Sequence, residues 1–210
     1  MNARRSLLVT AVALWAVAVG AGMVKLWQYS LAPGEPGTPP AAWPTDSHIS
    51  RRVDKLALIM TLHPRCPCSR ASVGELAKLM ALSQKNIQAY VVFVAPPGSG
   101  EDWVKTDLWR STGLIPGAIR LIDDGREARL FGAATSGDTA VYDSRGRLVF
   151  NGGITGARGH FGDNAGENPV AEIAHHPDAG KTVQVANSPV YGCPLFAPGS
   201  SKKGVETCPR

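Results

Sequence analysis

Residues 55–82, KLALIMTLHPRCPCSRASVGELAKLMAL, contain the pattern that decides the fold. The stretch opens with a short, continuous apolar run (55–62), which is typical of a strand buried on both faces of a sheet. From Ser69 onward, apolar side chains recur at helical spacing and predict an amphipathic helix. A second apolar run, QAYVVFVA at residues 88–95, predicts a second strand. If the two strands pair in parallel, this order makes a right-handed βαβ unit.

The remainder of the chain continues the α/β pattern. The expected elements are, in chain order, a helix at 101–112, a strand at 118–123, a short helix at 125–131, a hairpin of strands at 139–143 and 147–150, and a short helix at 169–175.

The first 30 residues have the composition of a membrane segment. Arg4 and Arg5 precede an uncharged run at residues 6–24, and about 20 apolar residues in a helix span a hydrocarbon core of roughly 30 Å. Trp27 and Tyr29 follow where interfacial aromatics sit. An uncleaved anchor explains these features better than the alternative, a cleaved signal peptide. We therefore expect a single-pass protein of the cell membrane, with its domain on the extracytoplasmic (periplasmic) side.

Composition divides the chain into four parts. Residues 31–44 contain five prolines and two glycines with no apolar period, which indicates a semi-extended segment. We expect a membrane segment at 1–30, a spacer at 31–48, the globular domain at 49–185 and an irregular, cysteine-containing tail at 186–210.

The net charge of +5 belongs mainly to the membrane segment. Without Arg4, Arg5 and Lys25, 19 basic side chains remain against 17 acidic ones. No cluster of Lys or Arg interleaved with aromatics follows in the sequence, so the composition excludes nucleic acid as a partner.

Cys66-Pro67-Cys68 lies between the predicted buried strand and the amphipathic helix. A helix N-terminus stabilises a thiolate through its amide groups and its dipole, and Arg65 and Arg70 add positive charge. At such positions the pKa of a cysteine falls from about 8.5 to as low as roughly 3.5. Because the thiolate attacks in disulfide exchange, Cys66 and Cys68 are the predicted catalytic pair, and Pro67 stiffens the link between them.

A metal site and a purely structural role are the alternatives for these cysteines. Thiolates combined with imidazole suit copper or zinc. The candidate ligands are Cys66, Cys68 and His160, and the other histidines on which this interpretation draws are His63, His175 and His176.

Cys193 and Cys208 form a second pair near the end of the chain. In an exported protein a structural disulfide that closes a loop of about 15 residues contributes roughly 3 kcal/mol in the entropic model, so we expect these two to be bonded. The alternative is that Cys193 joins the Cys66/Cys68 site, where it passes electrons or adds a metal ligand.

The glycine-rich stretch GGITGARGHFGDNAG (152–166) contains Arg158, His160, Asp163 and Asn164. A solvated loop is one interpretation. The other is a loop folded over the thiols, with His160 as general base or charge partner.

These motifs carry a family resemblance. The first strand, HPRCPCSRAS (63–72), the helix and the second strand resemble the first half of a thioredoxin domain. TAVYDSRGRLVFNGG (139–153) resembles the second half found in membrane-anchored TlpA/ResA-like thioredoxins, and the whole is most similar to the exported group labelled RedB. The resemblance implies a thioredoxin-like three-layer sandwich with a central mixed sheet. It also implies an exposed, attacking Cys66 and a deeper, resolving Cys68.

Two departures separate the chain from this family. The Cys-x-x-Cys motif has become Cys66-Pro67-Cys68, and the family's cis-proline falls near Gly137, within Thr135-Ser136-Gly137. In such enzymes that proline approaches the disulfide and helps to receive substrate.

The sequence as a whole predicts a membrane-tethered thiol–disulfide oxidoreductase that needs no cofactor. Its expected partners are protein thiols or disulfides and the membrane. A metallochaperone that holds copper and a non-catalytic assembly factor are the alternative functions.

Overall fold

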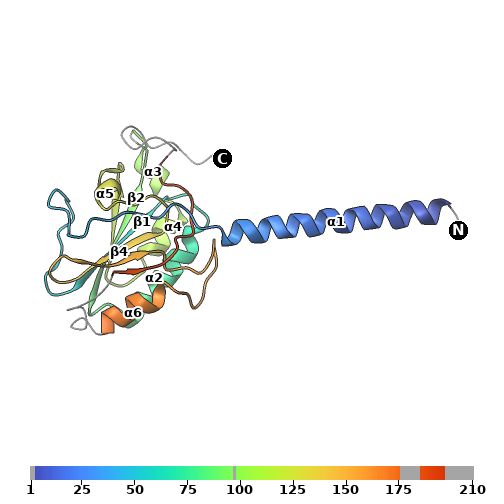
Figure 1. The fold of residues 1–210 in the computed structure, drawn as a ribbon. Helices are drawn as coiled ribbons and strands as arrows, with labels where there is room; N and C mark the ends of the chain where they lie inside the picture. The colour runs from blue at the N-terminus through green and yellow to red at the C-terminus, as the bar shows by residue number, and fades with distance from the viewer. Residues whose placement is uncertain (1–2, 97, 176–184, 197–210) are drawn as a thin grey trace. The chain divides into compact units, whose positions relative to one another are not determined.

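The computed structural model describes residues 3–96, 98–175 and 185–196. The chain divides into two compact units, Met1–Ala32 and Pro33–Arg210, and Figure 1 shows the elements of each. The first unit contains α1, Ala3–Leu31, a helix long and apolar enough to cross a membrane. An anchor and a signal sequence share this property, so the helix agrees with both interpretations of the N-terminal segment.

A six-stranded mixed sheet forms the centre of the second unit. The strand order is β3-β2-β1-β4-β5-β6. β1 pairs in parallel with β2 and β2 with β3, whereas β4 lies antiparallel to β1 and to β5. The strands are β1 (Leu56–Leu62), β2 (Ile87–Val94), β3 (Ala118–Asp123), β4 (Asp138–Tyr142), β5 (Leu148–Gly152) and β6 (Ala186–Asn187). The predicted parallel pairing of the first two strands and the predicted hairpin are therefore confirmed.

Alternating side chains of β1 give the sheet two buried faces. Leu56, Leu58, Met60 and Leu62 pack with the apolar side chains of α2, α4 and α6, whereas Ala57 and Ile59 pack on the opposite side with Ile49 and Phe131. These two apolar clusters make the predicted three layers. The helices of this unit are α2 (Ser69–Ser83), α3 (Glu101–Val104), α4 (Asp107–Thr112), α5 (Arg126–Leu130) and α6 (Glu167–His175).

The helix predicted for residues 101–112 is two short helices. Between α3 and α4 the backbone of Thr106 is extended, with ψ 179°. Its hydroxyl donates to the carbonyl oxygen of Pro64 at 3.0 Å, directly before the cysteines. The break has a tertiary cause, because neither glycine nor proline lies within residues 101–112.

The proline-rich segment before β1 lies against the domain. Thr38 N donates to Gly132 O at 2.8 Å, and Trp43 N donates to Gly146 O at 2.8 Å. The indole of Trp43 meets the ring of Tyr142 edge-on, with centroids 5.3 Å apart. The compact unit therefore begins at Pro33 and includes most of the predicted spacer.

Candidate thiol site

The two thiols lie in the turn that joins β1 to α2, as the sequence predicts. Cys66 N donates to His63 O (3.1 Å) and Ser69 N donates to Cys66 O (3.2 Å), so the chain winds before the helix begins. Cys68 precedes the first helical residue and already has helical dihedral angles, φ −65° and ψ −29°. Both cysteines are free thiols.

The burial of Cys66 differs from the expectation that it is exposed. Cys66 is only 3% exposed and Cys68 is 9% exposed, because a segment from the far end of the chain covers the first sulfur. Cys193 Sγ lies 3.1 Å from Cys66 Sγ. This is the arrangement that the alternative role of Cys193 requires. Cys208 falls outside the described residues, so the Cys193–Cys208 bond stays a prediction.

Hydrogen-bond donors converge on the sulfur of Cys66. His63 N donates to Ser136 Oγ (2.7 Å), which in turn shares a hydrogen bond with Ser69 Oγ (2.7 Å). Hydrogen bonds from Cys193 first, and from Ser69 next, lower the pKa of Cys66 to about 4, although burial acts in the opposite direction. Cys66 is therefore a thiolate at neutral pH.

Cys68 has the opposite character. Burial, and then the charge of Cys66, raise the pKa of Cys68, while Arg158 acts to lower it. Arg158 also donates from its guanidinium to the carbonyl oxygen of Gly192, in the segment that covers the site. One thiol is thus ionised and its neighbour is protonated, which distinguishes an attacking sulfur from a resolving one.

The arginines predicted to support the site interact with other groups. The guanidinium carbon of Arg65 lies 5.0 Å from the ring centre of Trp103, and Arg70 forms an ion pair with Asp107. Pro67 is exposed between the two buried cysteines. The thiolate is therefore stabilised by hydrogen-bond donors and not by these two arginines.

The glycine-rich loop is folded, and it reaches the thiols through a different residue from the one expected. Glu75, which is fully buried on α2, accepts a hydrogen bond from Gly162 N at 2.7 Å. His160 is exposed, and its Nδ1 lies 2.9 Å from the carbonyl oxygen of Arg158. It is Arg158 that interacts with Cys68. The abundance of glycine indicated a shaped loop, but it did not indicate which side chain points inward.

His63 is a buried histidine beside Cys66. Its ring meets Trp103 edge-on, with centroids 5.4 Å apart, and its Nδ1 accepts a hydrogen bond from Arg65 N at 3.2 Å. Burial lowers the pKa of His63, although the charge of Cys66 acts to raise it. The neutral ring therefore carries its proton on Nε2, an atom without a hydrogen-bond partner among the described residues.

Thr135-Ser136-Gly137 is the tripeptide where the resemblance places the family's cis-proline. No peptide bond is cis in the part of the chain that the structure describes. Gly137 has φ +103° and donates from its N–H to Thr61 O at 2.8 Å. Ser136, which is fully buried, shares a hydrogen bond with Ser69 through its hydroxyl and donates from its N–H to the carbonyl oxygen of Cys193 (2.8 Å). The sequence identified this tripeptide only by its lack of proline and did not predict the contacts of Ser136.

A metal site is not assembled among residues 3–96, 98–175 and 185–196. These ranges contain no group of three or more His, Cys, Asp or Glu side chains placed to hold a metal ion. Of the three candidate ligands, Cys66 and Cys68 share the turn, while His160 is directed at a backbone carbonyl.

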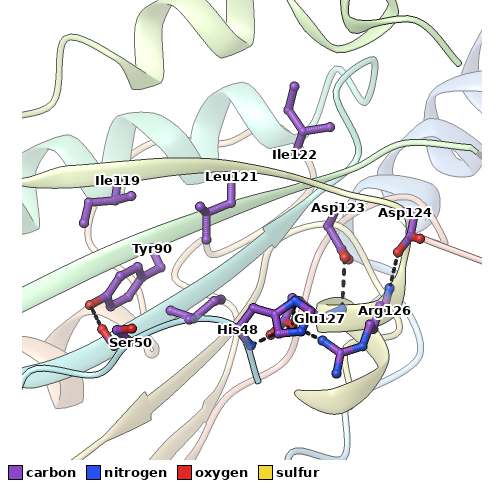
Figure 2. Close-up of a pocket in the computed structure, with 11 residues that line it drawn as sticks. His48, Ser50, Tyr90, Ile119, Leu121, Ile122, Asp123, Asp124, Arg126 and Glu127 are labelled. Carbon is purple, nitrogen blue, oxygen red and sulfur yellow. Dashed lines mark hydrogen bonds and ion pairs between the residues drawn. The ribbon is translucent and has the colours of Figure 1, made fainter. Parts of the chain in front are cut away.

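A pocket of about 690 Å³ lies along β3, lined also by residues from β2 and α5 (Figure 2). Its apolar lining includes Ile119 and Leu121, and the hydroxyl of Tyr90 at its edge donates to Ser50 O at 2.6 Å. None of the cysteines in the described part of the chain lines this pocket. The pocket is therefore separate from the thiol chemistry.

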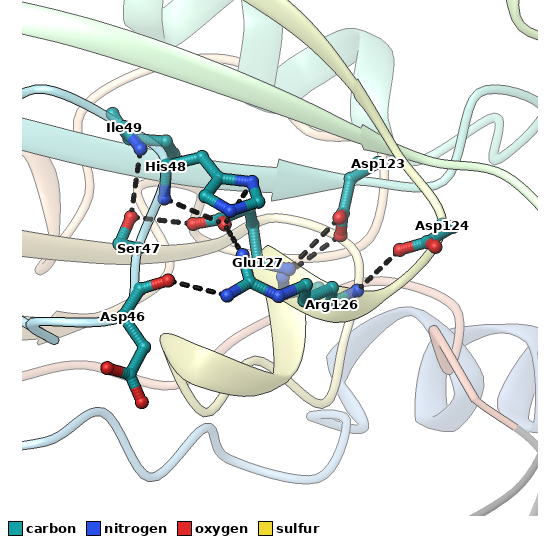
Figure 3. Close-up of polar contacts among 9 residues, drawn as sticks. Asp46, Ser47, His48, Ile49, Asp123, Asp124, Arg126 and Glu127 are labelled. Atoms are coloured by element: carbon teal, nitrogen blue, oxygen red, sulfur yellow. Dashed lines mark hydrogen bonds and ion pairs between the residues drawn. The ribbon is translucent and has the colours of Figure 1, made fainter.

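The polar side chains at the rim of this pocket form a network of hydrogen bonds and ion pairs (Figure 3). The carboxylate of Glu127 accepts hydrogen bonds from Ser47 Oγ (2.6 Å) and His48 N (3.1 Å) and pairs with Arg126 (2.8 Å). Asp123 accepts from the N–H groups of the first turn of α5. These interactions join the segment before β1 to α5.

We expect Cys193→Ala to raise the pKa of Cys66 from about 4, because the variant removes the first donor to the thiolate. Ser69→Ala should raise it less, since Ser69 is the second donor. The measurement is the ultraviolet absorbance of the thiolate against pH, with the matching Cys66→Ser protein subtracted. An unchanged midpoint in Cys193→Ala would show that the contact does not stabilise the charge.

A second prediction concerns Asp138, which holds the Ser136 loop in place. Its Oδ2 accepts from Ala134 N (2.7 Å) and Thr135 N (2.8 Å), and burial raises the pKa of Asp138 to about 6. A raised pKa stabilises the fold below the unfolded-state value, and this contribution is lost as pH rises through about 6. Relative to Asp138→Asn, the wild-type free energy of unfolding should fall by about 2–3 kcal/mol between about pH 4 and about pH 7.

Urea titrations of the full chain at several pH values measure this difference. Asp102→Asn serves as the control, since Asp102 is exposed on α3 and should show no such trend. A pH-independent difference for Asp138→Asn would contradict the assignment.

No family model and no curated protein sequence matches the chain. Among solved structures, an uncharacterized conserved protein from Geobacillus kaustophilus is 19% identical with a TM-score of 0.57, and the alignment covers 80% of this chain and 94% of that one. A hypothetical protein from Sinorhizobium meliloti 1021 is 19% identical with a TM-score of 0.54, covering 79% and 94%. A pneumococcal exposed lipoprotein thioredoxin from Streptococcus pneumoniae is 16% identical with a TM-score of 0.43, covering 66% and 99%.

These likenesses concern the fold. The finer TlpA/ResA-like and RedB-type assignments stay predictions. The mixed sheet, with parallel strands on one side of β1 and antiparallel strands on the other, agrees with the fold that the sequence implies. The strand order and the position of the dithiol between β1 and α2 agree with the thioredoxin-like fold that the sequence implies.

Proposed function

We propose that the chain is a thiol–disulfide oxidoreductase with Cys66 and Cys68 as its redox couple, tethered by α1 to the outer face of the cell membrane. One observation carries the proposal. The environment lowers the pKa of Cys66 to about 4 and raises that of the adjacent Cys68. A structural or inert pair does not need such a separation, whereas disulfide exchange uses it directly.

The first step is attack by the Cys66 thiolate on a disulfide of a substrate protein. A bond forms between Cys66 Sγ and one substrate sulfur, and the other substrate sulfur leaves as a thiolate that takes up a proton. Cys66 then carries no charge. The electrostatic contribution that raised the pKa of Cys68 therefore disappears, while Arg158 continues to lower it.

The second step follows from that change. Cys68 ionises more readily in the mixed disulfide than in the resting protein, and its sulfur attacks Cys66 Sγ. The Cys66–Cys68 bond forms, the substrate leaves as its second thiol, and two electrons have passed to the substrate. Because every step is reversible, the oxidised couple can also introduce a disulfide into a reduced partner.

Turnover of a peptide that carries a glutathione disulfide tests this function. The full chain should catalyse its reduction with glutathione as reductant, and Cys66→Ser should lower the rate by about a hundredfold or more because the attacking thiolate is lost. Cys68→Ser combined with Cys193→Ser, which leaves no neighbouring thiol beside Cys66, should accumulate the mixed disulfide.

The control for this assay is Arg70→Gln. Arg70 is exposed and paired with Asp107 outside the donor set of Cys66, so this variant should retain activity within a few-fold. Absence of turnover would favour the non-catalytic assembly factor. Copper that copurifies stoichiometrically, is removed by a chelator and is lost in Cys66→Ser would favour the metallochaperone.

Tethering by α1 is tested by fractionation. The helix is long and apolar enough to cross a membrane, and Arg4 and Arg5 precede its apolar run. We therefore expect the protein to remain in the membrane pellet after a carbonate wash, with Met1 or Asn2 at its N-terminus. A soluble form that starts near Ala21 would show instead that the segment is a cleaved signal peptide.

A further inference from the structure

Residues near the end of the described chain lie along the Ser136 loop as an extended segment joined to it by a β-bridge. Ser136 N donates to Cys193 O at 2.8 Å, and Leu195 N donates to Ala134 O at 2.9 Å. Thr135 and Pro194 form an antiparallel bridge between these two bonds. Backbone pairing of this kind fixes the register of an extended segment, because a one-residue slip turns each side chain to the opposite face.

Apolar side chains hold the same segment on both sides of Cys193. Leu195 is 1% exposed and packs with Val94, Ala128 and Ala133. On the other side Val190 is 2% exposed. The position of Cys193 is thus set by the burial of its neighbours as well as by its own backbone.

Gly192 allows the close approach. A Cβ atom at this residue would lie 1.8 Å from the carbonyl oxygen of Ser136, a backbone atom that cannot move aside. The guanidinium of Arg158 donates to the carbonyl oxygen of Gly192 and thereby links the covering segment to the glycine-rich loop. The consequence is that Cys193 Sγ is held 3.1 Å from Cys66 Sγ.

We propose that Cys193 is a third redox cysteine, which resolves mixed disulfides on Cys66 by forming a Cys66–Cys193 disulfide. The inference rests on the proposed function, since it requires Cys66 to attack disulfides. It adds a second partner for Cys66 besides Cys68, and that partner lies on the segment that covers the site. For a substrate disulfide to reach Cys66, this segment must move away from the Ser136 loop. Cys66 is only 3% exposed while the segment covers it.

The exchange balances as follows. The Cys66 thiolate attacks the substrate disulfide, and one substrate sulfur leaves with a proton. When the segment returns, the Cys193 thiolate attacks Cys66 Sγ, the Cys66–Cys193 bond forms, and the second substrate sulfur leaves with a proton. The substrate gains two electrons and the pair Cys66/Cys193 loses two. Attack by Cys68 on Cys66 then transfers the disulfide to the Cys66–Cys68 couple and releases Cys193 as a thiol.

The test isolates the two sulfurs. A full chain with Cys68→Ser and Cys208→Ser retains only Cys66 and Cys193 as thiols, and glutathione disulfide is the probe. We expect a transient glutathione adduct followed by a protein two hydrogens lighter than the starting material. Peptide mapping without reductant should find Cys66 joined to Cys193. Adding Cys193→Ser should leave the adduct stable.

A pair of glycine variants tests the role of the docked segment. In the same background Gly192→Ala should slow ring closure by about tenfold or more, because the added methyl group displaces the segment and the effective concentration of Cys193 falls. Gly100→Ala is the matched control, since nothing lies within 4 Å of a Cβ at Gly100, and it should close at the parent rate.

The outcomes separate the inference from the proposed function. An adduct on Cys66 that persists while Cys193 stays open to alkylation overturns the inference and leaves the function intact. Failure of Cys66 to accept glutathione in any variant overturns both. In the oxidised protein with all four cysteines, Cys193 found only with Cys208 would also count against the third redox cysteine.

Discussion

A buried thiolate must be surrounded by hydrogen-bond donors, because burial without them would restore the proton to the sulfur. Cys66 satisfies this requirement with donors from Ser69 and Cys193, and Ser136 in turn contacts the hydroxyl of Ser69. Ser69 comes from the first turn of α2, Ser136 from the loop before β4 and Cys193 from the segment after β6. The sheet brings these parts together, since β1 lies between β2 and β4. The stability of the Cys66 thiolate therefore depends on the strand order of the sheet.

The same charge distinguishes the two sulfurs of the turn. While Cys66 is ionised it raises the pKa of Cys68, and when Cys66 enters a mixed disulfide that effect ends. In the proposed mechanism the thiol of Cys68 is thus protonated until Cys66 has formed a mixed disulfide. Because only Pro67 separates the two cysteines in the sequence, the charge of Cys66 acts directly on the ionisation of Cys68.

The elements with strong local signals could be predicted from the sequence. The apolar runs of β1 and β2 and the helical spacing of α2 identify buried elements before any contact is known, and the dithiol falls between them. The break between α3 and α4 could not be predicted, because it involves a hydrogen bond from the Thr106 hydroxyl to the carbonyl oxygen of Pro64. These two residues are 42 positions apart in the sequence. The contact between Cys66 and Cys193 spans 127 residues. From the sequence, this contact is only an alternative to a disulfide between Cys193 and Cys208.

The loop that lacks the family's proline also pairs with the segment that carries Cys193. The N–H of Gly137 donates to Thr61 O, and the N–H of Ser136 donates to Cys193 O. Proline at either position would remove the corresponding donor, and its fixed φ near −65° is incompatible with the φ of +103° at Gly137. Glycine at position 137 therefore permits a loop whose backbone amides remain available for pairing. In this chain the amide of Gly137 pairs with β1, and the adjacent amide of Ser136 pairs with the segment that brings Cys193 to Cys66.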